Sequence, residues 1–476
     1  MKKIKNYILP FLFSGLLFSC SDLVEGINED PNKLSINDAQ AVNVFQSALL
    51  ANQFFQTTNN VRNTMLWLGQ GTGIDRQYIP LNDWNNNTSA DSDSAWNLLY
   101  VNFLTQARIA QNKALEANNF KMLAVAQIVE AHAIGTATSL WGDIPYSEFK
   151  ILDPSNKPKF DKQSLVYSQL QTLLDEAIAN LTKAGAIPTN LDIYYSGNTS
   201  RWTQLAYSLK ARYFLHTKKY DLAKANALLG INTAANDFKA IFGGTTRNQN
   251  FNPFYAFLAV DRAGMMVASG YASTILNKNS ATNRTNAKTD ETARLAYNYN
   301  GNELNILATP TPGKFGQASN MPLVTYGEML LIIAEADART SFASGLASYN
   351  TYRALLNTGY SIGAANSGYN SLAFKYDPYT AADFAAGGIE NATATTLTDQ
   401  NALLREIYEE RYIYFIGNYE AFTDFRRTNN IAEIKINTSF AGTPQRLVYS
   451  QDEINANGAN VPSPLPAVTE KTEVHK

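Results

Sequence analysis

Apolar residues at helical spacing recur along most of this chain, and no other feature of the sequence restricts the fold as strongly. In one segment, Met122, Val125, Val129, Ala133 and Leu140 follow each other at intervals of three, four, four and seven residues. This spacing places them on one face of a helix with 3.6 residues per turn. Comparable patterns predict further helices at residues 94–117, 165–182, 199–216, 325–340 and 399–416. The signal for strands is weak throughout, so the sequence predicts a mainly α-helical fold.

The predicted helices follow one another in pairs joined by short loops. Shorter helices that complete such pairs are expected at 221–229, 348–357 and 419–427. A pair of this kind buries its apolar face only against its neighbours, as in a tetratricopeptide-like stack. The 34-residue signature of that repeat is not legible in the chain, so the pairing is a pattern rather than a motif. We also expect Asp161 to cap the helix at 165–182.

Three long stretches rich in Asn, Gly, Thr and Pro interrupt the helical patterns, at 69–93, 242–322 and 361–398. Loops of this length in a compact protein are usually functional or disordered. We therefore predict one mainly helical domain over residues 35–476. In it, the helix pairs form a scaffold and the loops pack over the scaffold as an irregular, ligand-binding layer.

The N-terminus has the layout of a bacterial export signal. Three lysines within the first five residues precede an apolar stretch at 7–18, which is too short to span a bilayer. Cys20 follows directly and is the only cysteine of the chain. The run LFSC resembles a lipobox, in which the cysteine is acylated and becomes the mature N-terminus. A plain secretory signal with a stray cysteine is the alternative.

From this layout we predict a lipoprotein signal peptide at 1–19, lipidation at Cys20 and a lipidated tether at 20–34. Acyl chains contribute about 0.8 kcal/mol per buried CH₂, so two or three of them hold a protein on a membrane. No later segment offers about 20 consecutive apolar residues, which is what a spanning helix needs. The lipid is therefore the expected membrane attachment.

Charge and histidine spacing exclude several function classes. Lys and Arg number 39 against 41 Asp and Glu, and no basic block stands out, so we expect no nucleic-acid binding. The three histidines are far apart, and no spacing of His, Cys and carboxylates suggests a zinc site. No metal and no cofactor are predicted.

Aromatic and polar residues alternate in two loop zones, and these zones are the candidate ligand site. A sugar ring stacks its C–H face on an aromatic ring, while its hydroxyls bond to amide, carboxylate and guanidinium groups. The first zone, at 65–86, supplies Trp67, Arg76, Tyr78, Asp83, Trp84 and Asn85. The second, at 252–271, supplies Tyr255, Arg262 and Tyr271. The alternative for each ring is that it anchors a long loop to the scaffold.

Carboxylates on the helix at 325–340 raise the question of catalysis. Glu328, Glu335 and Asp337 lie on a largely apolar helix, and glycoside hydrolysis requires two carboxylates at a set separation. The more economical interpretation is capping or ion pairing with Arg339, Arg426 or Arg427. No paired acid and base occurs in a loop, so we predict no catalytic residues and no enzyme. A lipid-anchored glycosidase remains the alternative from that class.

Seven motifs in order along the chain resemble the SusD/RagB family of outer-membrane lipoproteins. No single motif is specific, but their order is. They are NEDPNKLS at 28–35, AWNLLYVNFLTQAR at 95–108, SLWGDIPYSE at 139–148, RWTQLAYSLKARYFLH at 201–216, TYGEMLLIIAEADAR at 325–339, NYEAFTDFRRT at 418–428 and RLVYSQDEINANGANVP at 446–462. The chain departs from the family's pattern at Phe422, Val448 and Ser450, as expected of a divergent branch of the family.

The resemblance implies a scaffold of four tetratricopeptide-like units, no catalysis, and a ligand surface made by loops of the two zones. It also implies a SusC-like TonB-dependent transporter as partner, to which members of the family hand over oligosaccharides. The expected location is the outer face of the outer membrane, anchored by the lipid. Oligopeptide uptake by the same architecture is the alternative.

Overall fold

A computed structural model describes residues 40–57, 59–151, 153, 155–246, 249–308, 311–363, 368–392 and 397–476. The predicted signal peptide, Cys20 and the predicted tether lie outside the described residues. Within the described part of the chain, no helix combines the length and the apolar character that crossing a membrane requires.

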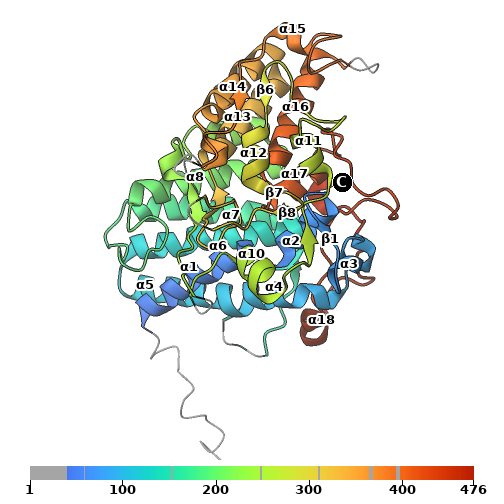
Figure 1. Cartoon of the computed structure of the whole chain (residues 1–476). Helices are drawn as coiled ribbons and strands as arrows, with labels where there is room; N and C mark the ends of the chain where they lie inside the picture. Colours follow the sequence, from blue (N-terminus) through green and yellow to red (C-terminus); the bar gives the residue numbers. More distant parts are fainter. Residues whose placement is uncertain are drawn as a thin grey trace, which may run out of the picture.

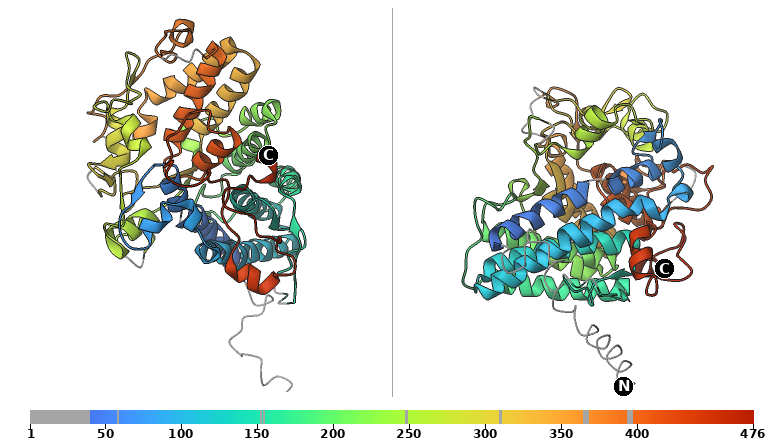
Figure 2. Two further views of the ribbon diagram at one scale, coloured as in Figure 1. Left: turned by 90° about the vertical axis from the view of Figure 1, so that its right-hand side faces the viewer. Right: turned by 90° about the horizontal axis from the view of Figure 1, so that it is seen from below.

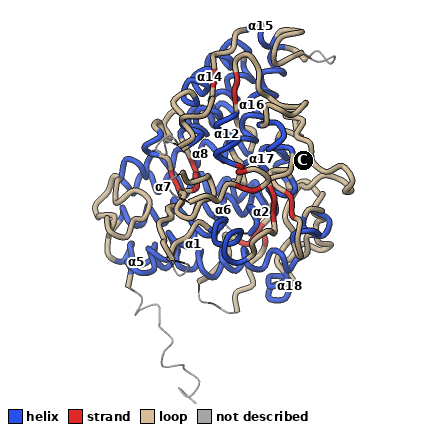
Figure 3. Tube along the Cα trace, in the orientation of Figure 1, coloured by secondary structure: helices blue, strands red, loops and turns tan. Residues whose placement is uncertain are grey.

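Helices make up most of the regular structure, and strands are short (Figure 3). The scaffold helices are α1 (Ala41–Thr57), α2 (Asn59–Trp67), α4 (Asp93–Asn97), α5 (Thr105–Glu116), α6 (Phe120–Trp141), α7 (Gln163–Leu181), α8 (Thr199–His216), α9 (Tyr220–Ala227), α13 (Tyr326–Thr340), α14 (Phe342–Leu356), α16 (Asp399–Tyr414) and α17 (Glu420–Arg427). Shorter helices lie in the loops: α3 (Tyr78–Leu81), α10 (Pro253–Tyr255), α11 (Tyr271–Leu276), α12 (Thr292–Asn298), α15 (Ala381–Phe384) and α18 (Gln451–Asn457). The mainly helical prediction is confirmed.

Consecutive scaffold helices pack side by side, α5 on α6, α6 on α7, α7 on α8, α8 on α9 and α13 on α14. Figure 2 shows α1, α5 and α6 as neighbouring rods when the molecule is seen from below. In Figure 1 the helices α13, α14 and α16 form the upper part of the molecule. One hydrophobic cluster runs through the scaffold, from Val44 to Val468. The arrangement is the tetratricopeptide-like stack that the helix pairs predict.

Short antiparallel strand pairs join segments of the loops, and all but one of these pairs, a local hairpin, link segments that are further apart in the sequence. They are β1 (Thr72–Gly73) with β5 (Met266–Val267), β2 (Ile144–Pro145) with β3 (Phe160–Asp161), β4 (Phe238–Ala240) with β9 (Met321–Val324), β6 (Thr289–Asp290) with β10 (Lys375–Tyr376), and β7 (Tyr299–Asn300) with β8 (Glu303–Leu304). Each sheet has two strands. Separate two-stranded sheets, rather than one continuous sheet, thus hold the loop layer together.

The helix predicted at 94–117 is continuous but not regular. Between α4 and α5 the backbone forms a π-helical stretch, Leu98–Leu104. Such stretches are rare and cost hydrogen-bond geometry. The stretch buries Leu99, Tyr100, Phe103 and Leu104 in the core, so apolar burial accompanies the altered pitch.

The predicted cap of α7 is wrong. Asp161 does not cap this helix but accepts hydrogen bonds from the backbone N–H and the hydroxyl of Ser147 at 2.6 and 2.8 Å. The free N–H groups of Gln163 and Ser164 donate instead to Asp143 at 3.0 Å and to Glu473 at 2.8 Å. Both carboxylates are distant in the sequence, so the local pattern holds no sign of them.

Helix α6 ends where the sequence pattern WGDIP places a stop. Gly142 follows Trp141 with φ +83° and donates its N–H to the Thr138 carbonyl at 2.9 Å. Glycine is favoured there because this backbone region strains other residues. The Trp141 indole is buried and donates to the Val448 carbonyl at 2.9 Å. This motif therefore belongs to the scaffold.

Candidate functional site

A groove of about 830 Å³ opens in the loop layer. Its described walls come from the region around α11, from α12, from the β7–β8 hairpin and from Asn305, Leu307 and Thr311, with residues 369 and 372 closing it. Figure 1 shows α11, α12, β7 and β8 together in the loop layer, in front of the red and orange C-terminal helices. A volume of 300–1,000 Å³ is typical of small-molecule sites. The groove is therefore a candidate binding site on size alone.

A close contact between the backbone at residue 69 and the backbone at residues 270–272 holds α11 at the groove. The N–H of Ala272 donates to the carbonyl of Gly69 at 3.0 Å. A Cβ on Gly270 would lie 2.3 Å from that same carbonyl oxygen, so only glycine fits there. The β1–β5 pair then joins Thr72 to Val267. The two loop zones that the sequence singles out therefore do meet in space.

The β7–β8 hairpin forms one rim of the groove. Its two-residue turn begins at Gly301, with φ +59°, as turns with glycine in the first central position require. Tyr299 anchors the hairpin by donating its hydroxyl to the Gln70 carbonyl at 2.9 Å. Asn300 and Asn302 are exposed, and neither side chain has a hydrogen-bond partner among the described residues. Both amides are thus available to a ligand.

The described residues that line the groove carry no charge. Amide side chains come from Asn277, Asn300, Asn302 and Asn305. Hydroxyl groups come from Ser269, Ser273, Thr274, Ser280, Thr292, Tyr299, Thr311 and Tyr369. The remaining lining residues are apolar or glycine: Ala268, Gly270, Leu295, Ala296, Gly301, Leu307 and Leu372. Amides and hydroxyls both donate and accept hydrogen bonds, which is also what sugar hydroxyls do.

Some of these polar groups are already used within the protein. The Asn305 amide donates to the Ala296 carbonyl at 2.7 Å and to the Tyr369 hydroxyl at 2.6 Å. Asn277 accepts from the Asn279 N–H at 3.1 Å, while its own NH₂ group donates to no described residue. Asn305 and Tyr369 therefore shape the wall of the groove, and Asn277, Asn300 and Asn302 present free groups.

The aromatic rings predicted as ligand contacts in the first zone are buried. Trp67 donates its indole N–H to the Leu81 carbonyl, and Trp84 donates to the Ala441 carbonyl, both at 3.0 Å. Tyr78 accepts from Arg62 Nε at 2.8 Å, and its ring packs against Phe257 with centroids 5.0 Å apart. In this structure the three rings anchor the loop, which is the alternative interpretation of the sequence. Their contact with a ligand stays a prediction.

The other predicted contacts are at least partly open to solvent, but none of them lines the groove. Arg76, Asn85 and Arg262 are exposed, whereas Asp83, Tyr255 and Tyr271 are half-buried. Asp83 caps a short turn by accepting from the Asn85 N–H at 2.9 Å. Tyr271 lies between the groove-lining Gly270 and Ser273, with its ring 6.0 Å from that of Tyr412. Ligand roles for these six residues also stay predictions.

Sequence reasoning missed the amides of the groove, although a signal was present. The run NYNGNEL at 298–304 combines asparagines with a glycine turn inside a loop that is longer than a compact fold needs. The contacts predicted in this loop, Tyr255, Arg262 and Tyr271, lie in other parts of it. Nothing in the sequence shows that residues near 277, 300 and 370 share one groove.

The carboxylates of α13 are all engaged in ion pairs. Glu335 is fully buried and bonds both η nitrogens of Arg427 at 2.6 and 2.5 Å, with Arg339 at 3.3 Å. Burial alone raises the pKa of Glu335, but the guanidinium of Arg427 outweighs it and holds that pKa at about 2. Ion pairing of Glu335 with these arginines is thus confirmed.

For Glu328, Asp337 and Arg426, the bonding partners differ from those expected. Glu328 pairs with Arg212, at 2.7 and 2.6 Å. Asp337 pairs with Lys224 at 2.5 Å. Arg426 donates to the carbonyl oxygens of Ser139 and Gln445 at 2.8 and 3.0 Å. Among the described residues, no group of three or more His, Cys, Asp and Glu is arranged to hold a metal ion.

A buried charge network ties α12 and the preceding loop to α16. Arg284 bonds Glu406 at 2.7 Å and Glu410 at 2.6 Å, and Arg294 bonds Glu410 at 2.6 Å. Burial raises the pKa of Glu406 from its usual 4.5 to about 7, against the opposing effect of Arg284. The other groups that act on Glu406 are Glu390, Arg353 and the Tyr349 hydroxyl. The wall of the groove thus rests on a titratable network.

This network predicts a pH dependence of stability. Because the pKa of Glu406 is raised in the folded state, the folded protein binds more protons than the unfolded chain between about pH 4.5 and 7. The contribution of Glu406 to the unfolding free energy therefore falls as pH rises through this window. Glu406→Gln is expected to reduce the loss of unfolding free energy between pH 5 and pH 7, measured by urea denaturation. Glu116→Gln, at an exposed position on α5, is the control; equal pH profiles for the wild type and Glu406→Gln would contradict the assignment.

Comparison with known proteins gives one family and one fold. The family model SusD-like, described as "Starch-binding associating with outer membrane", matches residues 31–449. Similar solved structures include a SusD/RagB family protein from Bacteroides thetaiotaomicron, with 19% identity, a TM-score of 0.64, and 92% of this chain and 99% of that chain covered. A chitin-binding SusD homolog from Flavobacterium johnsoniae has 18% identity and a TM-score of 0.63, with 91% and 98% covered. A SusD homolog from Bacteroides uniformis has 21% identity and a TM-score of 0.63, with 92% and 98% covered. No curated protein matches the chain.

Proposed function

The chain belongs to the SusD-like family, and from this premise we propose that it is a non-catalytic, cell-surface protein that binds oligosaccharides and delivers them to a SusC-like TonB-dependent transporter. The observation that carries the binding step is the groove of about 830 Å³ with its free amide groups at Asn277, Asn300 and Asn302. These groups pair with sugar hydroxyls in either direction. The proposed ligand site is therefore the groove, and contacts from the two loop zones remain predictions.

The absence of catalysis is supported by the state of the α13 carboxylates. A glycosidase needs an acid and a base whose pKa values are separated and which both face the substrate. Glu328 and Glu335 are fully buried and each is bonded to an arginine. Neither residue lines the groove. These carboxylates stabilise the scaffold in the proposed function.

The family and the N-terminal sequence support the proposed location. The signal-like residues 1–19 and the lipobox-like cysteine support export and a lipid anchor at Cys20. The family description associates its members with the outer membrane. We place the protein on the outer face of that membrane, held beside the transporter by the tether at 20–34.

A binding screen tests this proposal. The purified protein is titrated calorimetrically with neutral oligosaccharides and with oligopeptides of similar length. Saturable oligosaccharide binding without product is expected. The double change Asn300→Ala and Asn302→Ala is expected to weaken that binding by about tenfold, because two hydrogen-bonding amides are lost.

The control is Asn112→Ala, at an exposed position on α5 outside the groove, which is expected to leave the affinity unchanged. Turnover of an oligosaccharide would contradict the non-catalytic assignment. Binding of oligopeptides alone would replace oligosaccharide capture by oligopeptide uptake.

A further inference from the structure

The charge distribution around the groove narrows the class of ligand, provided that the groove binds oligosaccharides as proposed above. Charged residues make up 17% of the chain, yet none of the described residues lining this large groove is charged. Polar groups are present there, so the absence of charge is not a general lack of polarity. This combination points to a ligand that is rich in hydroxyls and carries no charge.

Two arginines on the elements that build the groove are directed away from it. Arg294, on α12, is buried and bonds Glu291 and Glu410, both at 2.6 Å. Arg284, on the loop after α11, is bonded to Glu406 and Glu410. These guanidinium groups are neutralised against α16 and do not line the groove.

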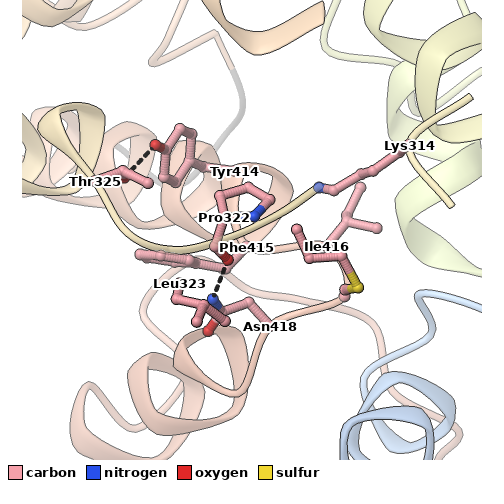
Figure 4. Close-up of a pocket in the computed structure, with 10 residues that line it drawn as sticks. Lys314, Pro322, Leu323, Thr325, Tyr414, Phe415, Ile416 and Asn418 are labelled. Carbon is pink, nitrogen blue, oxygen red and sulfur yellow. Dashed lines mark hydrogen bonds between the residues drawn. The ribbon is translucent and has the colours of Figure 1, made fainter. Parts of the chain in front are cut away.

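Lys314 is also turned away from the groove. Its backbone N–H donates to the Tyr297 carbonyl at 3.0 Å, which places it next to α12. Its amine, however, reaches toward Pro322 and Ile416 at a separate cavity of about 10 Å³ (Figure 4). That cavity has room for about one water molecule and excludes a sugar. The amine of Lys314 therefore cannot act as a counter-charge for a ligand in the groove.

The apolar lining fits the same class of ligand. Leu307 is 46% exposed and Leu372 is 38% exposed, so both present apolar surface to the solvent. Both line the groove. The C–H face of a neutral sugar ring can pack on them, whereas a carboxylate or sulfate placed there would lose hydration without gaining an opposite charge. Both ends of a free peptide are charged and meet the same obstacle.

From these observations we propose that the groove selects uncharged oligosaccharides against uronate-containing or sulfated oligosaccharides and against oligopeptides. Recognition then rests on the amides of Asn277, Asn300 and Asn302 and on the exposed leucines. Selectivity arises because a charged ligand would be desolvated in a groove that offers no opposite charge.

The test compares matched ligands at physiological salt, where long-range charge effects are largely screened. A neutral oligosaccharide and a uronate oligosaccharide of equal length and linkage are titrated against the wild-type protein. The neutral ligand is expected to bind at least about tenfold more tightly. Asn302→Lys places a cation on the rim of the groove and is expected to raise the affinity for the uronate ligand by at least about tenfold.

Asn112→Lys, the same substitution on α5, is the control and is expected to leave both affinities unchanged. Uronate binding as tight as neutral binding in the wild type would overturn this inference but leave oligosaccharide capture standing. No gain in uronate affinity for Asn302→Lys would also overturn it. Failure to bind any oligosaccharide would instead overturn the proposed function on which the inference rests.

Discussion

Replacing Arg427 by methionine is expected to lower the free energy of unfolding by about 3–5 kcal/mol, because it removes the cation that bonds both oxygens of the buried Glu335 carboxylate. Arg427 is fully buried and bonds Glu335 at 2.5 and 2.6 Å and Asp424 at 2.6 Å. Glu335 is fully buried as well, and its lowered pKa means that it stays ionised at neutral pH. Equilibrium denaturation in urea at pH 7 measures the loss.

The matched control is Arg339→Met, which removes the other arginine from the same carboxylate. Arg339 lies 3.3 Å from Glu335 and its side chain is 28% exposed. Partial exposure weakens such a pair, so a loss of about 1 kcal/mol or less is expected. Equal losses for the two variants would show that burial of Arg427 does not set the strength of the pair.

Trp84→Ala is also expected to cost about 3–5 kcal/mol of unfolding free energy, the usual range for removing a buried aromatic side chain. The indole is fully buried, contacts Phe440 edge-on with centroids 5.4 Å apart, and donates to the Ala441 carbonyl. It therefore holds the loop at 69–93 against the segment at 437–442. Asn86→Ala, two residues further on and exposed, is the control and is expected to change stability by no more than about 0.5 kcal/mol.

Trp84→Ala also decides whether this loop aromatic anchors the loop to the scaffold or contacts the ligand. If Trp84 is an anchor, the unfolding free energy falls, and binding at the groove is affected only through the loss of folded protein. If Trp84 contacts the ligand, the affinity falls while stability changes little. Denaturation and calorimetry on the same preparation separate the two results, and unchanged stability would contradict the anchoring role.

The scaffold was accessible from the sequence because burial in a helix has a local period. The stripe from Met122 to Leu140 lies within α6, and the pattern at 325–340 corresponds to α13. The stop of α6 at Gly142 is local as well, since the positive φ of this glycine belongs to its own turn. The order of seven motifs was sufficient to identify the family, which the match over residues 31–449 confirms.

The loop layer was less accessible because exposure in a loop has no period. In the sequence, Trp67 and Trp84 lie beside polar residues, as exposed rings do. In the structure both rings are buried, and their indole N–H groups donate to the carbonyls of Leu81 and Ala441. The cap of α7 failed as a prediction for the same reason, since Glu473 reaches the helix from the far end of the chain. Long-range contacts of this kind leave no local signature.

By itself, the sequence determined the helical scaffold, the family and the polar character of the long loops. Tertiary structure decided which loop side chains face each other, and so where an uncharged groove forms and which aromatic rings are withdrawn from it. The physical reason is that helix burial follows from a spacing of three to four residues, which the chain carries locally. The environment of a loop side chain depends instead on contacts such as Gly69 with Gly270, which form only when the whole chain has folded.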